Sequence, residues 1–197
     1  MKILVIGATG TLGQAVIAEL APRHTIIAAS RSSGEKVDIA DVVSIKALLT
    51  RTGKLDAIVC AAGNVHFGPL SEMTSELYGI GLKDKLMGQV NLVLMAQEAL
   101  NDGGSLTLIT GVLAQDPIRN GSSASMINGA LESFVAATAI ELPRGLRINA
   151  VSPTVLIESM GSYGPYFRGF KPIPASDAAL AFARSIEGAQ TGQIYRV

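Results

Sequence analysis

A glycine-rich turn between a strand and a helix is the feature that most constrains how this chain folds. Residues 2–6 form a continuous apolar run rich in β-branched side chains, which predicts a strand buried on both faces. The run stops at Gly7, and Gly10 and Gly13 follow at intervals of three residues. Beyond them the apolar residues recur at helical spacing. The chain therefore opens with a strand, a glycine turn and a helix.

The spacing of these glycines predicts a site for the pyrophosphate of a dinucleotide. The first glycine allows the tight turn, the second lets the backbone approach the phosphates, and the third lets the helix pack on the strand. The helix N-terminus adds free N–H groups and the positive end of its dipole. The predicted cofactor contacts in this turn are Gly7, Thr9, Gly10, Thr11, Leu12 and Gly13.

The rest of the chain repeats the alternation of strand and helix. Further strands are predicted at 24–29, 57–60, 105–110, 146–151 and 193–197, and helices at 42–49, within 71–101, at 124–142 and at 175–186. These six strands predict an α/β fold, a doubly wound parallel sheet of the Rossmann type in a three-layer αβα sandwich.

A short seventh strand is predicted at 36–38, close behind the second strand. Only residues 31–36 lie between Ser30, at the end of the second strand, and Val37 in the centre of the seventh. Because a parallel crossover normally takes about 10–12 residues including its helix, one helix of the usual arrangement is expected to be missing here.

Composition excludes several classes of partner. The 197 residues, 48% hydrophobic and 16% charged, predict a single globular domain over 1–197. The 16 Lys and Arg balance the 16 Asp and Glu, so no overall charge attracts nucleic acid or a membrane, and no apolar run reaches the ~20 residues of a membrane helix. A single cysteine, Cys60, and two histidines offer neither a disulfide nor a zinc site, which favours a reducing cytoplasm.

The end of the second strand indicates which dinucleotide is bound. About 20 residues past the turn, an NAD-binding site usually has an Asp or Glu for the ribose hydroxyls. This chain has Arg31 and Ser32 there, and a guanidinium beside a hydroxyl suits a 2′-phosphate. NADP(H) is therefore favoured, with NAD(H) and a merely solvated Arg31 as alternatives. Asp38 is placed where its carboxylate would accept a hydrogen bond from the adenine amino group.

Two short motifs elsewhere carry a family resemblance. Ala61-Ala62-Gly63 follows a strand, and Asn149-Ala150-Val151-Ser152-Pro153 ends another. The first is similar to the Asn-Ala-Gly turn, and the second to the Asn-x-Val-x-Pro-Gly motif, of the short-chain dehydrogenase/reductase family, which the chain resembles over essentially its whole length. The resemblance implies a cofactor site that includes Ala61, Ala62, Gly63, Thr110 and Pro153. It also implies a homodimer or homotetramer formed through helices 85–100 and 124–140.

The residues that would carry out the family's reaction are replaced in this chain. The resemblance implies the reduction of carbonyls or the oxidation of alcohols by an Asn, a Ser, a Tyr and a Lys, in which the tyrosine exchanges a proton with the substrate oxygen. The corresponding positions here hold, in that order, Lys85, Gly111, Ala124 and Asn128. No Tyr-x-x-x-Lys occurs anywhere in the sequence.

Two functions therefore stay open, and whether the chain is an enzyme is one of the questions. The first is an NADP(H)-dependent oxidoreductase of a small carbonyl or alcohol with a non-standard proton donor. In it Lys85 would restore positive charge near the ribose, and Tyr163 or Tyr166 of the loop 161–174 would fold over the nicotinamide. Losing a positioned general acid removes about 10² to 10⁴ in rate, so slow turnover would survive. The second is a redox-inactive NADP(H)-binding sensor, scaffold or partner subunit. The sequence names no substrate.

Overall fold

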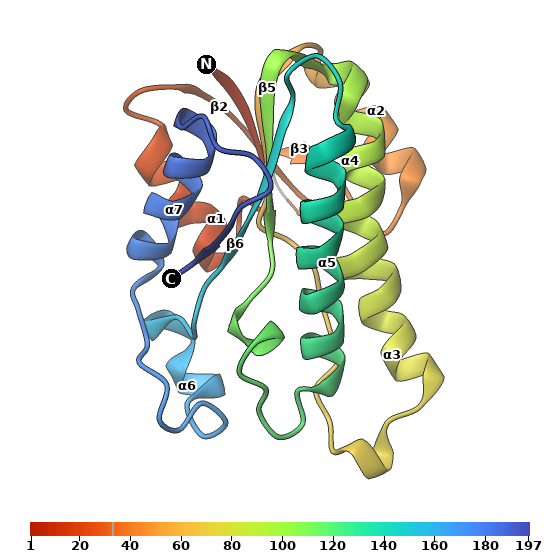
Figure 1. The fold of residues 1–197 in the computed structure, drawn as a ribbon, viewed down its shortest axis with the longest axis vertical. Helices are drawn as coiled ribbons and strands as arrows, with labels where there is room; N and C mark the ends of the chain where they lie inside the picture. Colours follow the sequence, from red (N-terminus) through yellow and green to blue (C-terminus); the bar gives the residue numbers. More distant parts are fainter. Residues whose placement is uncertain (33) are drawn as a thin grey trace.

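A computed structural model describes residues 1–32 and 34–197, and within these residues a single parallel sheet forms the centre of the molecule (Figure 1). Its seven strands follow the order β3-β2-β1-β4-β5-β6-β7. They are β1 (Lys2–Ile6), β2 (Thr25–Ser30), β3 (Glu35–Lys36), β4 (Leu55–Cys60), β5 (Leu100–Ile109), β6 (Arg147–Ser152) and β7 (Ile194–Arg196). The order reverses between β1 and β4, and ligands of open α/β sheets bind beyond the carboxyl ends of the strands at such a point.

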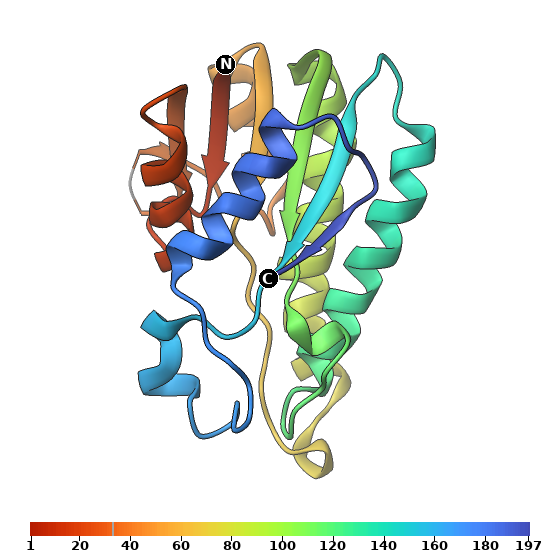
Figure 2. The same ribbon diagram turned by 60° about the vertical axis from the view of Figure 1, so that its left-hand side comes forward.

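Helices cover both faces of the sheet, which makes three layers (Figures 1 and 2). One face carries α1 (Thr11–Leu20) and α7 (Ala175–Glu187), and the other carries α2 (Val42–Thr52), α4 (Met87–Ala99) and α5 (Ser122–Glu141). The shorter α3 (Ser75–Gly81) and α6 (Met160–Tyr163) lie in the loops beyond the carboxyl ends of the strands (Figure 1). A π-helical turn, η2 (Leu82–Leu86), joins α3 to α4. The predicted doubly wound α/β fold is confirmed.

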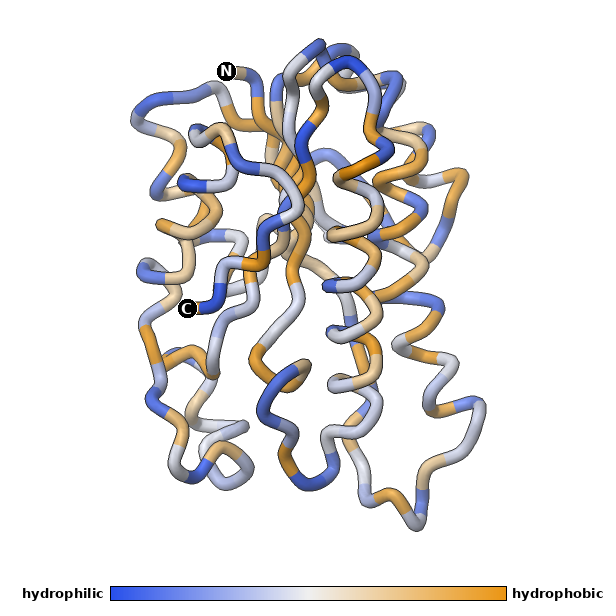
Figure 3. The backbone as a smooth tube through the Cα atoms, in the orientation of Figure 1, coloured by the Kyte–Doolittle hydropathy of each residue, from blue (hydrophilic) through white to orange (hydrophobic). Residues whose placement is uncertain are grey.

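The strands separate two hydrophobic cores because successive side chains of a strand point to opposite faces. In β1, Ile3 and Val5 pack with Phe182 of α7, whereas Leu4 and Ile6 pack against the other helical layer. The strands accordingly form the apolar centre of the molecule (Figure 3). In the described residues no helix combines the length and the apolar character needed to cross a membrane.

Most strand ends differ from the prediction by one or two residues, and two strands differ in a way that affects the topology or the register. The short seventh strand exists, but it is Glu35–Lys36, and in the described part of the connection from β2 no helix intervenes. Strand β5 begins at Leu100 and not at 105, because Leu100 pairs with Leu55 before an irregularity shifts the register to Ala57 and Ser105. A bulge of this kind lets polar residues join a strand whose alternation they interrupt.

Candidate nucleotide-binding and active site

The glycine turn is fixed by two close backbone approaches. Gly7 has φ +87°, and a Cβ there would lie 2.6 Å from the carbonyl oxygen of Ala61. A Cβ on Gly13 would lie 2.1 Å from the carbonyl oxygen of Gly7, so this position holds the helix against the turn. Gly10 differs, since a Cβ there would meet only the Gly7 oxygen, at 3.4 Å. The missing side chain of Gly10 therefore leaves its backbone accessible from the neighbouring cleft.

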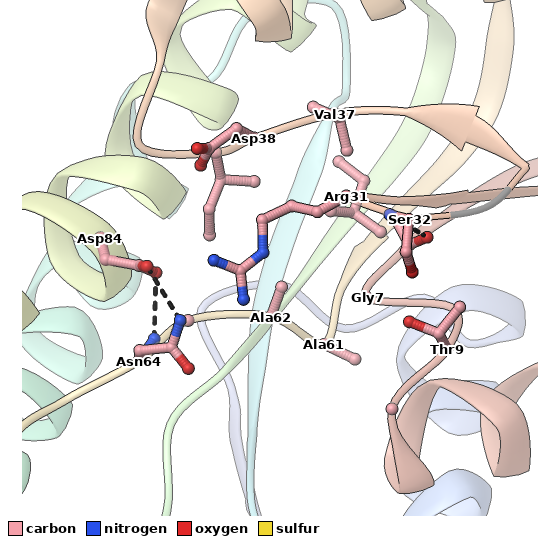
Figure 4. A pocket seen from close by; sticks show the side chains of 15 residues that line it. Gly7, Thr9, Arg31, Ser32, Val37, Asp38, Ala61, Ala62, Asn64 and Asp84 are labelled. Carbon is pink, nitrogen blue, oxygen red and sulfur yellow. Dashed lines mark hydrogen bonds between the residues drawn. The ribbon is translucent and has the colours of Figure 1, made fainter.

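That cleft has a volume of about 430 Å³ and lies beyond the carboxyl ends of β1, β2 and β4 (Figure 4). It is lined by Ile6, Gly7, Thr9, Gly10, Ser30, Arg31, Ser32, Val37, Asp38, Ile39, Ala61, Ala62, Gly63, Asn64 and Asp84. The structure thus brings together most of the residues that the sequence assigns to a cofactor. Thr11 and Gly13 are not among the lining residues.

The N-terminus of α1 faces this cleft without a local anion. Gly10 is its N-cap, no side chain caps it, and its first turn contains no acidic residue. Arg31 extends across the cleft between Asp38 and Ala62 (Figure 4), and it forms no salt bridge with the described residues. A helix N-terminus and an unpaired guanidinium fit a pyrophosphate and a further phosphate.

One carboxylate oxygen of Asp38 is hydrogen-bonded to the backbone two residues further along the chain. Its Oδ1 accepts a hydrogen bond from the Ala40 N–H at 2.9 Å, while the apolar Val37 and Ile39 flank it on the cleft wall. At the far end Asp84 accepts hydrogen bonds from the backbone and side-chain nitrogens of Asn64, both at 3.0 Å (Figure 4). No sequence motif marks this pair, although Asn64 directly follows the predicted Ala-Ala-Gly turn.

A second, smaller pocket of about 250 Å³ is lined by all four residues that the sequence alignment predicts at the family's catalytic positions. Its lining is mostly apolar and comprises Leu12, Val65, Phe67, Lys85, Ile109, Thr110, Gly111, Val112, Leu113, Ala124, Asn128, Pro153, Thr154, Val155, Leu156, Ser159, Tyr163 and Phe167. Leu12, Thr110 and Pro153, predicted as cofactor contacts, lie here. Gly63 of the cleft abuts Lys85, since a Cβ on Gly63 would lie 2.6 Å from Lys85 Cγ. The two pockets therefore meet at Lys85.

The Lys85 ammonium is held inside this pocket by two oxygens. Its Nζ donates to Asn128 Oδ1 at 2.7 Å and to the Thr110 carbonyl at 3.1 Å. Asn128 in turn donates through Nδ2 to the Gly111 carbonyl at 3.3 Å. Lys85 is 9% exposed, and burial lowers its pKa to about 8. At neutral pH the group is still mainly an ammonium.

Aromatic side chains close the opposite side of the pocket. The ring of Tyr163 lies 5.9 Å from that of Phe67 and 6.5 Å from that of Phe167, measured between centroids. Tyr163 is the last residue of α6, at the start of the predicted loop 161–174, and it is 42% exposed and lines the pocket. Tyr166, the alternative candidate, is 51% exposed and is not among the lining residues.

Comparison with known proteins identifies the family. The model of a family described as enoyl-(acyl carrier protein) reductase matches residues 13–190. This chain belongs to the short-chain dehydrogenase/reductase family. The crystal structure of a Listeria innocua protein is 51% identical, with a TM-score of 0.98, over 100% of this chain and 99% of that one.

More distant members of the family include oxidoreductases and a dehydrogenase crystallised with a nucleotide. The L-xylulose reductase of Bos taurus is 27% identical over 81% of this chain and 73% of its own length. An uncharacterised oxidoreductase of Mycobacterium tuberculosis is 29% identical over 78% of this chain and 67% of its own. A small-chain dehydrogenase crystallised with NADPH is 25% identical, with a TM-score of 0.89, over 100% of this chain and 96% of that one.

The sequence alignment predicts that Lys85 stands at the family's asparagine position and Asn128 at its lysine position. In the structure these two side chains are hydrogen-bonded to each other. The cation is thus kept in the pocket, but it comes from the π-helical turn η2 and not from α5.

The serine position of the short-chain dehydrogenases cannot be filled by a neighbour. Gly111 is predicted at this position, and a Cβ there would lie 3.1 Å from Asn128 Nδ2, so a side chain would crowd the hydrogen-bonded pair of Lys85 and Asn128. The hydroxyl of the adjacent Thr110 donates to the Val151 carbonyl at 3.3 Å and lies 3.4 Å from a Glu132 oxygen. Thr110 therefore lines the pocket without offering a free hydroxyl in place of the serine.

Proposed function

We propose that this protein is an NADP(H)-dependent oxidoreductase of a small carbonyl or alcohol substrate, with a proton donor other than the tyrosine of its family. The observation that carries the proposal is the junction of the two pockets at Lys85. A cleft suited to a dinucleotide adjoins, across the contact between Gly63 and the Lys85 side chain, an apolar pocket that contains the buried Lys85 ammonium, so cofactor and substrate have adjoining places.

The cleft favours NADP(H) over NAD(H). Arg31 and Ser32 stand at the end of β2, where an acidic residue would favour NAD(H), and Arg31 is unpaired among the described residues. The pyrophosphate would lie at Gly7, Thr9, Gly10 and the start of α1, and the adenine between Val37 and Ile39, where the free oxygen of Asp38 faces its amino group. The NADPH complex of a 25% identical dehydrogenase supports this choice.

The second pocket would receive the nicotinamide and the substrate. When bound, the reduced nicotinamide supplies the hydride. Leu12, Thr110 and Pro153 would contact it, and the remaining apolar wall would hold the substrate's organic part. Two titratable side chains line this pocket, the buried Lys85 and the partly exposed Tyr163. Either one would have to replace the proton donor that Ala124 lacks.

A redox-inactive role is the second candidate, because Gly111 and Ala124 remove both hydroxyls that normally act on the substrate oxygen. Such a protein would sense NADP(H), or serve as a scaffold or partner subunit. Its cleft would bind NADP(H) with the same affinity as the cleft of an active enzyme.

Nucleotide titration followed by turnover separates these functions. The sequence contains no tryptophan, so the emission of the reduced nicotinamide can be followed directly as protein is added. A change with NADPH that is weaker with NADH supports the proposed site, and no change with either nucleotide contradicts it. NADPH oxidation is then measured at high protein concentration against a panel of aldehydes and ketones. Binding without turnover of any of them would favour the redox-inactive role.

A further inference from the structure

We propose that the Lys85 ammonium binds the carbonyl oxygen of the substrate and delivers the proton to it, so that an amine on the π-helical turn replaces the phenol of the family. This inference rests on the proposed function and assigns the reacting group within it. Its substrates are neutral aldehydes or ketones with a small apolar substituent.

Hydrogen-bond geometry leaves Lys85 one proton to give. An ammonium has three N–H groups. Two of them point to Asn128 Oδ1 at 2.7 Å and to the Thr110 carbonyl at 3.1 Å, and no described residue accepts the third. Because Lys85 lines the pocket, an oxygen of a ligand there is the partner that completes its coordination. After the third proton has left, the neutral amine still satisfies both acceptors, so the same geometry holds both protonation states.

The charges around Lys85 leave its positive charge uncompensated inside the pocket. It is the only charged group among the described lining residues. Cys60 of β4 is buried, and burial raises the pKa of its thiol to about 12, so it is neutral. Asp84, on the same turn, accepts from Asn64, and Glu132 of α5 is bound to Gln115 and Arg196 at 2.7 Å and 2.9 Å. An unpaired ammonium in an apolar pocket stabilises negative charge that develops on a bound oxygen.

The step balances without any further reagent. The hydride moves from the reduced nicotinamide to the carbonyl carbon, and the C=O π electrons become an O–H bond to a proton from Lys85 Nζ. The products are NADP⁺, an alcohol and a neutral lysine, which takes its next proton from water. In the reverse direction the neutral amine accepts the proton of the alcohol.

Tyr163 is less suited to this role. It stands at the exposed side of the pocket, in contact with Phe67 and Phe167 and open to water, whereas the Lys85 ammonium is enclosed and held by two acceptors. Lys85, with its pKa lowered to about 8 by burial, lies near the pH at which proton transfer works in both directions.

The test compares two ligands of one shape, phenylacetate and phenylacetamide, by calorimetry in the presence of NADP⁺. The carboxylate imitates the oxygen that becomes negative, so we expect it to bind at least about tenfold more tightly than the amide at pH 7. The ammonium is present below its pKa, so the preference should hold at pH 7 and disappear well above the lysine pKa, by pH 10. Equal binding of acid and amide at pH 7 would overturn the proposal.

Two lysines of the same turn provide a matched pair of variants. Lys85→Met should abolish the preference, and Lys83→Met, which removes an exposed cation two residues away, should retain it. NADPH binding by Lys85→Met shows that the variant is folded, and the pH series on the unmodified protein needs no variant. If Lys85→Met keeps the preference, another group binds the oxygen and the proposal is wrong.

Turnover adds a second readout, which separates this inference from the proposed function. With a carbonyl that is reduced, the rate should fall as pH rises through the lysine pKa, and Lys85→Ala should regain activity with added methylamine. A flat profile with no rescue would leave the oxidoreductase in place and refute Lys85 as its acid. No turnover at all would contradict the proposed function and the proton step, while the ligand pair still decides whether the oxygen site exists.

Discussion

Lys85 and Asn128 are hydrogen-bonded across two helical elements, with 2.7 Å between Nζ and Oδ1, at positions where the sequence alignment predicts an asparagine and a lysine in other family members. The contact joins residues 43 positions apart in the chain. The ammonium therefore enters the pocket from η2, and the amide that holds it comes from α5.

Reversing the exchange should show that the two residues act as a unit. Asn128→Lys alone would bring two ammonium groups together in a buried site, and we expect it to destabilise the protein by several kcal/mol. Lys85→Asn alone removes the cation. The double variant Lys85→Asn with Asn128→Lys should be more stable than the sum of the single effects by about 0.5–3 kcal/mol, measured by urea unfolding. Additive effects would show that the pair is not coupled.

Arg31→Ala should distinguish the two dinucleotides. Removing a charge-assisted hydrogen bond costs about 1.5–3 kcal/mol, so NADPH should bind about tenfold or more weakly, whereas NADH should change little. Fluorescence titration with both nucleotides measures this. Lys46→Ala, which removes an exposed cation on α2, is the control and should leave both affinities unchanged. Equal weakening of NADPH and NADH by Arg31→Ala would mean that Arg31 does not contact a 2′-phosphate.

Two glycines of the turn should respond differently to alanine. At Gly13 the new Cβ would lie 2.1 Å from the Gly7 oxygen, so Gly13→Ala should lower the melting temperature strongly. At Gly10 the nearest atom would be 3.4 Å away, so Gly10→Ala should remain stable and lose NADPH affinity, because the methyl group enters the cleft. Thermal unfolding and titration of both variants test the pair. A stable Gly10→Ala variant with unchanged affinity would argue against phosphates at this position.

Exposed apolar residues on α4 and α5 should form the interface between copies of the chain. Leu94 is 58% exposed and Ile140 86% exposed. We expect light scattering to show a dimer or tetramer. The double variant Leu94→Glu with Ile140→Glu should have a lower mass, that of the monomer or of a smaller oligomer. Leu180→Glu, at a residue 56% exposed on α7, places the same charge on the opposite layer and should leave the α4/α5 contact intact. A monomeric parent protein would contradict the expectation.

The fold could be predicted from the sequence because its elements carry strong local patterns. The apolar run of β1 and the helical spacing after Gly13 identify their elements without tertiary information. The start of β5 at Leu100 could not be predicted, since two polar residues and two glycines separate Leu100 from Ser105 and the register shifts between them. The bounds of the short β3 were missed as well, because two residues are too few to show a period.

The site residues that belong to a local sequence motif could be predicted, whereas contacts between residues far apart in the sequence could not. The glycine turn and Arg31 have local context, and the structure places them in one cleft. Alignment to the family gives the identities of Lys85 and Asn128, but their hydrogen bond depends on how η2 and α5 pack. Asp84 was missed for the same reason, since its partner Asn64 is 20 positions away.

The burial of Cys60 has a practical consequence for spectroscopy. It is the one cysteine of the sequence, it is fully enclosed, and at a pKa of about 12 it has almost no thiolate at neutral pH. The unmodified protein therefore provides a silent background for thiol labelling. In a Tyr163→Cys variant the new, exposed cysteine would be the single reactive thiol. A probe attached to it would report the distance between the end of α6 and a fluorescent nucleotide in the cleft.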